Sequence, residues 1–149
     1  MPSPVVADAA AIAAMIPDGA SVALMREPDQ PMEVVRALIA RGARDLHVIT
    51  VPTSGLATDA LIGAGCVGTV ETSGVSLSEF GPAPFFVEAV KAGSVRLKDA
   101  TCPAVHSALL AGTKGVPFMA IRGIVGSDLL KARPDWTVIQ NPMAEEADP

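Results

Sequence analysis

The first third of the chain alternates between strand-like and helix-like segments, and this alternation constrains the fold more than any other feature of the sequence. Residues 21–25 (SVALM) and 45–51 (DLHVITV) are short apolar runs that indicate buried strands. Between them, a helical pattern opens at Pro31 and runs to Arg41, with Gly42 just past its end. A strand–helix–strand order is typical of a parallel sheet with helices on its faces. We therefore predict an α/β fold.

The rest of the chain continues this alternation. Thr101 is placed to cap a helix in which Val105, Leu109 and Leu110 point inward. Residues 116–121 contain Pro117 and are therefore a poor candidate for a central strand. We expect further helices at 7–16, 58–64, 84–92, 103–111 and from 127 or 128 to 132, and further strands at 67–72, 94–98, 116–121 and 136–140. The 149 residues form a single predicted domain, 1–149, with no internal repeat and no linker.

Composition excludes several classes of function. Half of the residues are hydrophobic and 18% are charged, which favours a packed core and leaves room for a buried subunit interface. The net charge of −5 argues against a general nucleic-acid or anionic-membrane binder. The longest apolar run, residues 9–16, is far shorter than a membrane span, and no basic residue precedes Arg26 as a secretory signal would require. We expect a cytoplasmic protein.

Cysteine and histidine do not occur in a metal-binding pattern. Cys66 and Cys102 form no CxxC pair, and His47 and His106 lie far from each other and from any patterned ligand. Free cysteines are among the most buried residue types, so we expect two free, buried or half-buried thiols. We predict no metal site.

The loop after the second predicted strand is the first candidate for ligand binding. Thr53, Ser54 and Gly55 follow Pro52, and Thr58 and Asp59 stand where a helix would begin. In an α/β sheet, ligands bind at the carboxyl ends of the strands, where free backbone N–H groups favour a carboxylate or phosphate. Most such turns only connect a strand to a helix, and that interpretation remains open.

Four stretches together resemble a known family. They are PDGASVAL, PMEVVRALIARGARDLHVIT, DALIGAGCVGTVETSGVSLSEFGPAPFFVEAVKAGSVRL and ALLAGTKGVPFMAIRGIVGSDLL. Over about residues 15–141 the chain resembles the A-type (α) subunit of the family I coenzyme A transferases, of the glutaconate CoA-transferase type. The most specific parts are LIGAG, GPAPFFVEAVKAG and PFMAIRGIVGSDLL. The resemblance implies a three-layer α/β/α sandwich with a mainly parallel open sheet, in agreement with the pattern of segments.

The resemblance also implies an activity, the exchange of CoA between an acyl-CoA and a carboxylic acid. In the family a glutamate carboxylate attacks the thioester, and this glutamate lies on the B-type partner in a motif like S-E-N-G. That motif is absent here, and Glu79 in SLSEFG matches a glutamate of the A-type pattern itself. We therefore expect no catalytic residue in this chain, coenzyme A as a substrate, and a hetero-oligomer with a B-type subunit, with no metal, nucleic acid or membrane involved.

The chain departs from the family in two further respects. The A-type subunits commonly have a glycine-rich loop after their first strand, whereas residues 25–30 read MREPDQ here and contain no glycine. These subunits also continue well beyond WTVIQNP, so the resemblance implies a chain that is shortened at its C-terminus. A shortened fold would leave a sheet edge and apolar faces uncovered, and we expect exposed hydrophobic surface or a partner there.

Each candidate residue has a structural alternative. Arg26 either binds a substrate carboxylate or CoA phosphate, or belongs to a solvated turn. The residues after the second strand either donate hydrogen bonds to an acyl group or form a capping turn, and Glu79 either orients substrate or bonds a backbone amide. Arg122 and Gly123 either fix a loop near the cleft or form a structural turn. The substrate- or CoA-binding residues that we predict are Arg26, Gln30, Thr53, Ser54, Gly55, Ser78 and Glu79.

Three hypotheses for function remain at this point. The first is the A-type component of a CoA transferase, active with a B-type partner. The second is a CoA-thioester hydrolase of the same fold, in which water replaces the acceptor acid. The third is a non-catalytic binding or scaffold subunit.

Overall fold

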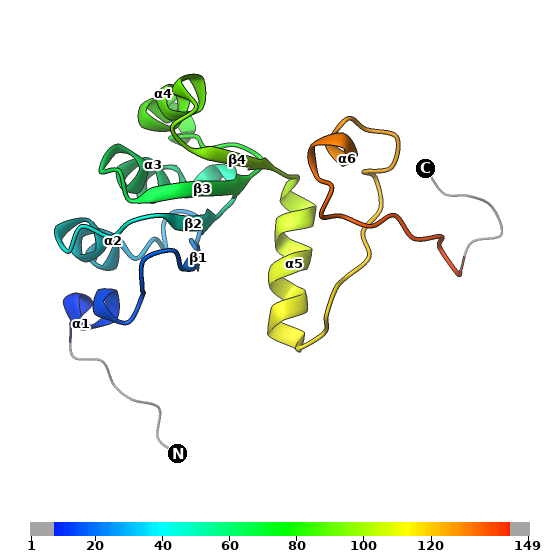
Figure 1. Ribbon diagram of the computed structural model, residues 1–149, viewed down its shortest axis with the longest axis horizontal. Helices are drawn as coiled ribbons and strands as arrows, with labels where there is room; N and C mark the ends of the chain where they lie inside the picture. The colour runs from blue at the N-terminus through cyan, green and yellow to red at the C-terminus, as the bar shows by residue number, and fades with distance from the viewer. Residues whose placement is uncertain (1–7, 144–149) are drawn as a thin grey trace, which may run out of the picture.

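A computed structural model describes residues 8–143 and places a parallel sheet of four strands at the centre of the fold (Figure 1). The strands follow one another across the sheet in chain order, and every neighbouring pair is parallel. They are β1 (Ser21–Ala23), β2 (Leu46–Ile49), β3 (Val67–Thr72) and β4 (Arg96–Asp99). The predicted α/β fold with a parallel sheet is confirmed.

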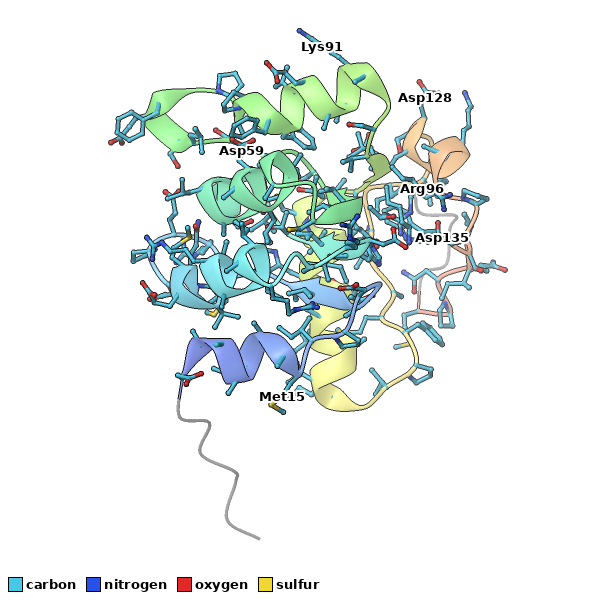
Figure 2. The ribbon with its side chains drawn as sticks, turned by 60° about the vertical axis from the view of Figure 1, so that its left-hand side comes forward. Met15, Asp59, Lys91, Arg96, Asp128 and Asp135 are labelled. Atoms are coloured by element: carbon cyan, nitrogen blue, oxygen red, sulfur yellow. The ribbon has the colours of Figure 1, made fainter. Side chains whose placement is uncertain are left out.

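Helices form a layer on each side of the sheet. The connections between the strands carry α2 (Met32–Ala40), α3 (Gly55–Gly63) and α4 (Pro84–Ala92), which lie on one face. On the other face lies α5 (Cys102–Lys114), as Figures 1 and 2 show together. The smaller elements are α1 (Ala9–Ala14) beside α2, the 3-10 turns η1 (Pro52–Ser54) and η2 (Ser78–Phe80), and α6 (Leu129–Ala132). No helix in residues 8–143 is long and apolar enough to cross a membrane.

The core lies between the sheet and the layer of α2, α3 and α4. Leu46, Val48 and Val70 point from the strands into this layer and are completely buried, and Leu38 and Leu61 from the helices pack against them. Side chains alternate between the two faces of a strand, so His47 and Glu71 project toward the α5 side. One face of the sheet is therefore apolar, and the other carries a row of polar groups.

Two predictions about helix starts have different outcomes. Thr101 caps α5 as expected, since its Oγ1 accepts a hydrogen bond of 3.2 Å from Ala104 N. Helix α3 begins at Gly55 rather than at 58, because the 3-10 turn η1 leads directly into it. Thr58 and Asp59 are thus buried inside α3 and do not serve its N-terminus. Instead, Asp59 Oδ1 accepts a hydrogen bond of 2.8 Å from Phe86 N and so caps α4 (Figure 2).

The prediction of the last two strands is wrong, because neither segment forms a strand in the structure. Residues 116–121 and 136–140 are irregular, and no strand of the described chain pairs with them. A strand needs a neighbour to bond its backbone, and a local apolar pattern cannot supply one. Leu109 and Leu110 of α5, predicted to point inward, remain 40% and 43% exposed.

Candidate functional site

Three loops meet at the carboxyl edge of the sheet, after β1, β2 and β3. The loop after β1 reaches the next one through Glu27, whose N–H donates to Thr53 O at 2.9 Å. The loop after β3 reaches the same segment through Ser76, whose N–H donates to Pro52 O at 3.0 Å. The parallel topology thus brings residues 24–31, 50–55 and 73–83 together, although they are far apart in sequence.

Gln30 connects the first loop to helix α3. Its side-chain Nε2 donates to Thr53 O at 3.4 Å, and its Oε1 accepts a hydrogen bond of 3.0 Å from Ala57 N. Ala57 is in the first turn of α3, so Gln30 satisfies one of the N–H groups that a helix leaves free at its start. This N–H is therefore not available to the anion that the sequence pattern led us to expect there.

Ser54 and Gly55 build the turn on which the other loops rest. Ser54 is completely buried, and its Oγ donates to Val51 O at 2.8 Å. A Cβ atom on Gly55 would lie 1.8 Å from the backbone oxygen of Ser76, so no side chain fits at this position. These two residues hold the loops after β2 and β3 in close contact, and Thr53 between Pro52 and Ser54 is exposed.

Ser78 lies at the tip of the third loop in an unusual backbone conformation. Its φ of 55° falls in the left-handed region, which costs energy for residues other than glycine and is concentrated at functional sites. Its N–H bonds Ser76 Oγ at 3.1 Å, and its Oγ lies 3.5 Å from Glu27 Oε2. Glu79 and Phe80 follow it and are exposed, Phe80 to 83%.

Arg26 and Glu79 are the two charged candidates without a partner. Within residues 8–143, neither side chain makes a hydrogen bond or an ion pair, and both are exposed. Arg26 therefore has its full set of donors available to an anionic group. The seven predicted residues lie on three adjoining loops, where Gln30, Ser54 and Gly55 hold the loops together and Arg26, Thr53, Ser78 and Glu79 face solvent.

The start of α5 lies beside these loops and carries a thiol. Cys102 Sγ is 3.0 Å from the Oγ of Ser73, which follows β3 directly. Cys66 is buried, and burial raises the pKa of its thiol; both cysteines are free. No group of three or more His, Cys, Asp or Glu side chains able to hold a metal ion occurs in the described part of the chain.

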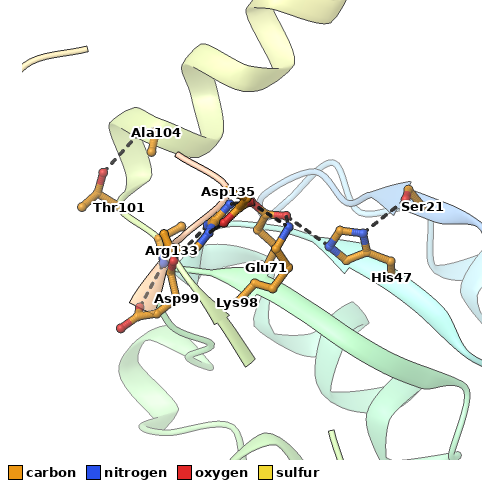
Figure 3. A network of polar contacts seen from close by, with 10 residues as sticks. Ser21, His47, Glu71, Lys98, Asp99, Thr101, Ala104, Arg133 and Asp135 are labelled. Atoms are coloured by element: carbon orange, nitrogen blue, oxygen red, sulfur yellow. Dashed lines mark hydrogen bonds and ion pairs between the residues drawn. The ribbon is translucent and has the colours of Figure 1, made fainter. Parts of the chain in front are cut away.

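A second polar assembly, which we did not predict, runs across the α5 face of the sheet (Figure 3). Ser21 Oγ lies 3.2 Å from His47 Nδ1, and His47 Nε2 lies 3.2 Å from Glu71 Oε2. Lys98 Nζ is 3.2 Å from the same carboxylate oxygen. One residue from each of the four strands thus contributes to a continuous polar row.

Arg133 ties the C-terminal segment to this row. Its Nη2 lies 2.7 Å from Glu71 Oε1 and 2.8 Å from Asp135 Oδ2, and its Nη1 donates to the Asp99 carbonyl at 3.0 Å. The guanidinium also lies 4.2 Å from the centre of the Trp136 ring. Arg133 is 3% exposed, so its guanidinium is held out of water, whereas the side chains of Lys98 and Asp135 remain 32% and 46% exposed. We call Glu71, Lys98, Arg133 and Asp135 the Arg133 cluster.

The charges of the Arg133 cluster shift one another's ionisation. Burial alone would raise the pKa of Glu71, but hydrogen bonds and charges from Arg133 and Lys98 outweigh it and lower that pKa. The hydrogen bond from Arg133 likewise holds the pKa of Asp135 far below its usual value. Both carboxyl groups stay ionised at neutral pH, and the cluster acts as a structural anchor.

Two known proteins are similar to this chain, one in structure and one in sequence. The chain superimposes on the crystal structure of a variant of the decarboxylase AibA/AibB with a TM-score of 0.79 and 29% identity, over 95% of this chain and 55% of that chain. It is 29% identical over 119 residues to the A component of the 3-oxoadipate CoA-transferase of Pseudomonas knackmussii, which is 78% of this chain and 42% of the relative. The resemblance to A-type CoA-transferase subunits is confirmed.

No family model matches the sequence. The chain spans less than half the length of the curated relative, and slightly more than half of the solved decarboxylase chain.

Proposed function

We propose that this chain is an A-type subunit of an enzyme that transfers CoA between an acyl-CoA and a carboxylic acid, with the catalytic glutamate on a B-type partner. The observation that carries the proposal is the meeting of three carboxyl-end loops that present Arg26, Thr53, Ser78 and Glu79 to solvent. It is supported by the similarity to the A component of a CoA-transferase over 78% of the chain. An incomplete site, exposed at the edge of a sheet, suits chemistry shared between two subunits.

The reaction requires a carboxylate and a site shielded from water. The partner's carboxylate attacks the thioester carbonyl, the C–S bond breaks, and CoA leaves as a thiolate while an acyl anhydride forms. The thiolate then attacks the enzyme side of the anhydride, which releases the first acid and leaves a thioester on the glutamate. The acceptor acid repeats these steps in reverse order. Water must be excluded, because it would hydrolyse either intermediate.

This chain would bind and position the substrates. Arg26 is the one candidate cation on the three loops, and its planar guanidinium suits a carboxylate or a phosphate. The Thr53 and Ser78 hydroxyl groups can donate to an acyl oxygen, while the closely packed turn at Ser54 and Gly55 keeps them in place. Coenzyme A enters as the substrate's carrier group and not as a resident cofactor.

A second candidate activity is decarboxylation. The solved structure that the chain resembles at 29% identity is that of a decarboxylase. An exposed arginine next to hydroxyl groups could bind the carboxylate of an acid destined for decarboxylation as readily as that of an acceptor acid. Hydrolysis of a CoA thioester at the same site, or a purely scaffolding role, are the other outcomes that an activity test must separate.

The test is an activity panel on the native assembly purified from its own cells. Exchange of labelled CoA between an acyl-CoA and a free acid indicates transfer; thiol release without an acceptor indicates hydrolysis; release of CO₂ indicates decarboxylation.

Arg26→Ala should raise KM about tenfold to a hundredfold, because a hydrogen bond to a charged group contributes about 1.5–3 kcal/mol. Arg36→Ala, which removes an exposed arginine on the outer side of α2, is the matched control. Equal KM values for the two variants would contradict the role of Arg26.

A further inference from the structure

The polar row on the α5 face contains a serine, a histidine and a glutamate in consecutive contact (Figure 3). Ser21 Oγ lies 3.2 Å from His47 Nδ1, and His47 Nε2 lies 3.2 Å from Glu71 Oε2. A nucleophile within reach of a base, which a third group orients in turn, is the arrangement that activates serine hydroxyl groups in catalysis. Ser21 begins β1, so these residues are separate from the three loops, which follow the carboxyl ends of the strands.

The position of Glu71 decides which nitrogen of His47 carries the proton. A lone pair on Nε2 would face a carboxylate oxygen, so in the neutral imidazole we place the proton on Nε2. Nδ1 then has a free lone pair, and the Ser21 hydroxyl is the donor in the contact between the two residues. His47 is thus placed to accept the proton of Ser21.

Glu71 is itself held in place. Its Oε1 accepts a hydrogen bond of 2.7 Å from Arg133, and its Oε2 lies 3.2 Å from Lys98 Nζ as well as from His47. Two cations therefore fix the carboxylate that orients the imidazole. A fixed carboxylate at this position also stabilises the imidazolium that forms when His47 takes up a proton.

The serine lies where a substrate can approach it. Ser21 is exposed, and β1 is the edge strand of the sheet in residues 8–143. Ala20 O accepts from His47 N at 2.9 Å, and Leu24 N donates to Ile49 O at 3.0 Å, so residues 20, 22 and 24 face β2. In a parallel pair the alternate residues face away, which directs the Ser21 N–H to the open edge. An N–H beside the nucleophile can donate to the oxyanion that forms during acyl transfer.

We propose that Ser21 is an activated nucleophile, and that Ser21, His47 and Glu71 form a second, esterase-type site for small uncharged esters. The substrate class follows from the charges around the site. Lys98 and Arg133 both pair with Glu71 and Asp135, so these cations are not available to anionic groups such as the phosphates of CoA. The proposal does not rest on the CoA-transferase function.

The proposed reaction has two steps. Ser21 Oγ attacks the ester carbonyl, and its proton passes to His47 Nδ1. The C–O bond to the leaving alcohol breaks, the alcohol takes that proton, and the acyl group remains on Ser21 as an ester. Water then attacks this ester, with His47 taking a proton from the water and returning it to Ser21, so that the free acid leaves and the serine is regenerated.

Labelling of the native assembly with a fluorophosphonate tests the nucleophile without any substitution. The phosphorus bonds to the serine oxygen and fluoride leaves, and mass spectrometry locates the adduct. We expect the phosphonyl group on the peptide that contains Ser21 and not on the peptide that contains Ser127. Ser127 is the matched control, because it is also exposed but its hydroxyl donates to the Ile124 carbonyl at 2.7 Å rather than to a histidine.

Hydrolysis of p-nitrophenyl acetate measures the contribution of each residue. Ser21→Ala and His47→Gln should each lower the protein-dependent rate at least about a hundredfold, since a general base contributes about 10²–10⁴-fold. Ser127→Ala should keep the native rate, and thermal melting identifies the variants that retain the fold. Labelling of Ser21 no faster than that of Ser127 would overturn the proposal, as would equal rates for the native protein and Ser21→Ala.

Discussion

Glu71 and Arg133 are 62 positions apart in sequence, and their side chains meet at 2.7 Å on the α5 face of the sheet. Glu71 belongs to a central strand, and Arg133 follows α6 (Figure 3). The pair therefore fixes the segment around Arg133 against the α5 face of the sheet. Asp135 and Lys98 complete the charge balance, with two carboxylates facing two cations.

Removing Arg133 should destabilise the protein strongly. Arg133→Ala leaves the Glu71 carboxylate half-buried without its closest cation, and breaking such a buried pair costs about 3–5 kcal/mol. We expect a loss in the free energy of unfolding of about 3 kcal/mol, measured by urea denaturation. The control is Lys131→Ala, which breaks an exposed pair with Asp128 and should cost less than about 1 kcal/mol. Similar losses for both variants would show that the Arg133 cluster is not an anchor.

The Arg133 cluster should also make stability depend on acid pH. The pKa values of Glu71 and Asp135 are lowered in the folded state. Their contribution to the free energy of unfolding is therefore fully present above the ordinary carboxyl pKa of about 4. It is lost as the pH falls through the lowered pKa values. Buried Asp59 acts in the opposite direction, because burial raises its pKa and its contribution is lost as the pH rises.

The measurement is the free energy of unfolding at pH 7 and at pH 3 for the protein and for a Glu71→Gln variant. Asp59 is unchanged in both, so its contribution cancels in the difference between them. We expect the variant to lose less stability between the two pH values. An identical pH dependence in the two proteins would show that Glu71 is not stabilised as a carboxylate in the fold.

Gly55 should tolerate no side chain. A Cβ there would meet the Ser76 carbonyl at 1.8 Å, so Gly55→Ala must push two site loops apart. Overpacking of this kind typically costs about 1–3 kcal/mol. Gly112→Ala in α5 is the control, because nothing lies within 4 Å of its Cβ and alanine favours a helix by about 1 kcal/mol over glycine. Thermal melting should thus show opposite shifts for the two variants, and a Gly55→Ala protein that melts no lower than the native one would argue against the close packing.

How well the sequence predicted the fold depended on whether each element is determined locally. Residues 67–72 and 84–92 have the predicted bounds, because Gly93 and Pro84 mark the ends of the helix and the β3 pattern is strong. The start of α3 was misplaced because Gln30, from a distant loop, caps it. Residues 116–121 and 136–140 have strand-like patterns, but pairing is a property of two segments and cannot be inferred from one.

The candidate site was predictable in position but not in detail. A parallel sheet brings the loops after successive strands to one edge, and the loops that carry Arg26, Thr53 and Ser78 meet there. That the Ser54 hydroxyl turns inward to Val51 O depends on the turn's backbone, which residue types alone do not specify. The Arg133 cluster was missed because its residues come from segments with no sequence relation to one another.

The most direct test of the proposed function asks which polypeptide carries the covalent intermediate. The native assembly is incubated with an acyl-CoA and no acceptor acid, quenched, and digested for mass spectrometry. We predict CoA bound as a thioester to a glutamate of the B-type partner, with no added mass on any peptide of this chain. A CoA adduct on Glu79 or another carboxylate of this chain, or turnover by this chain alone, would contradict the account.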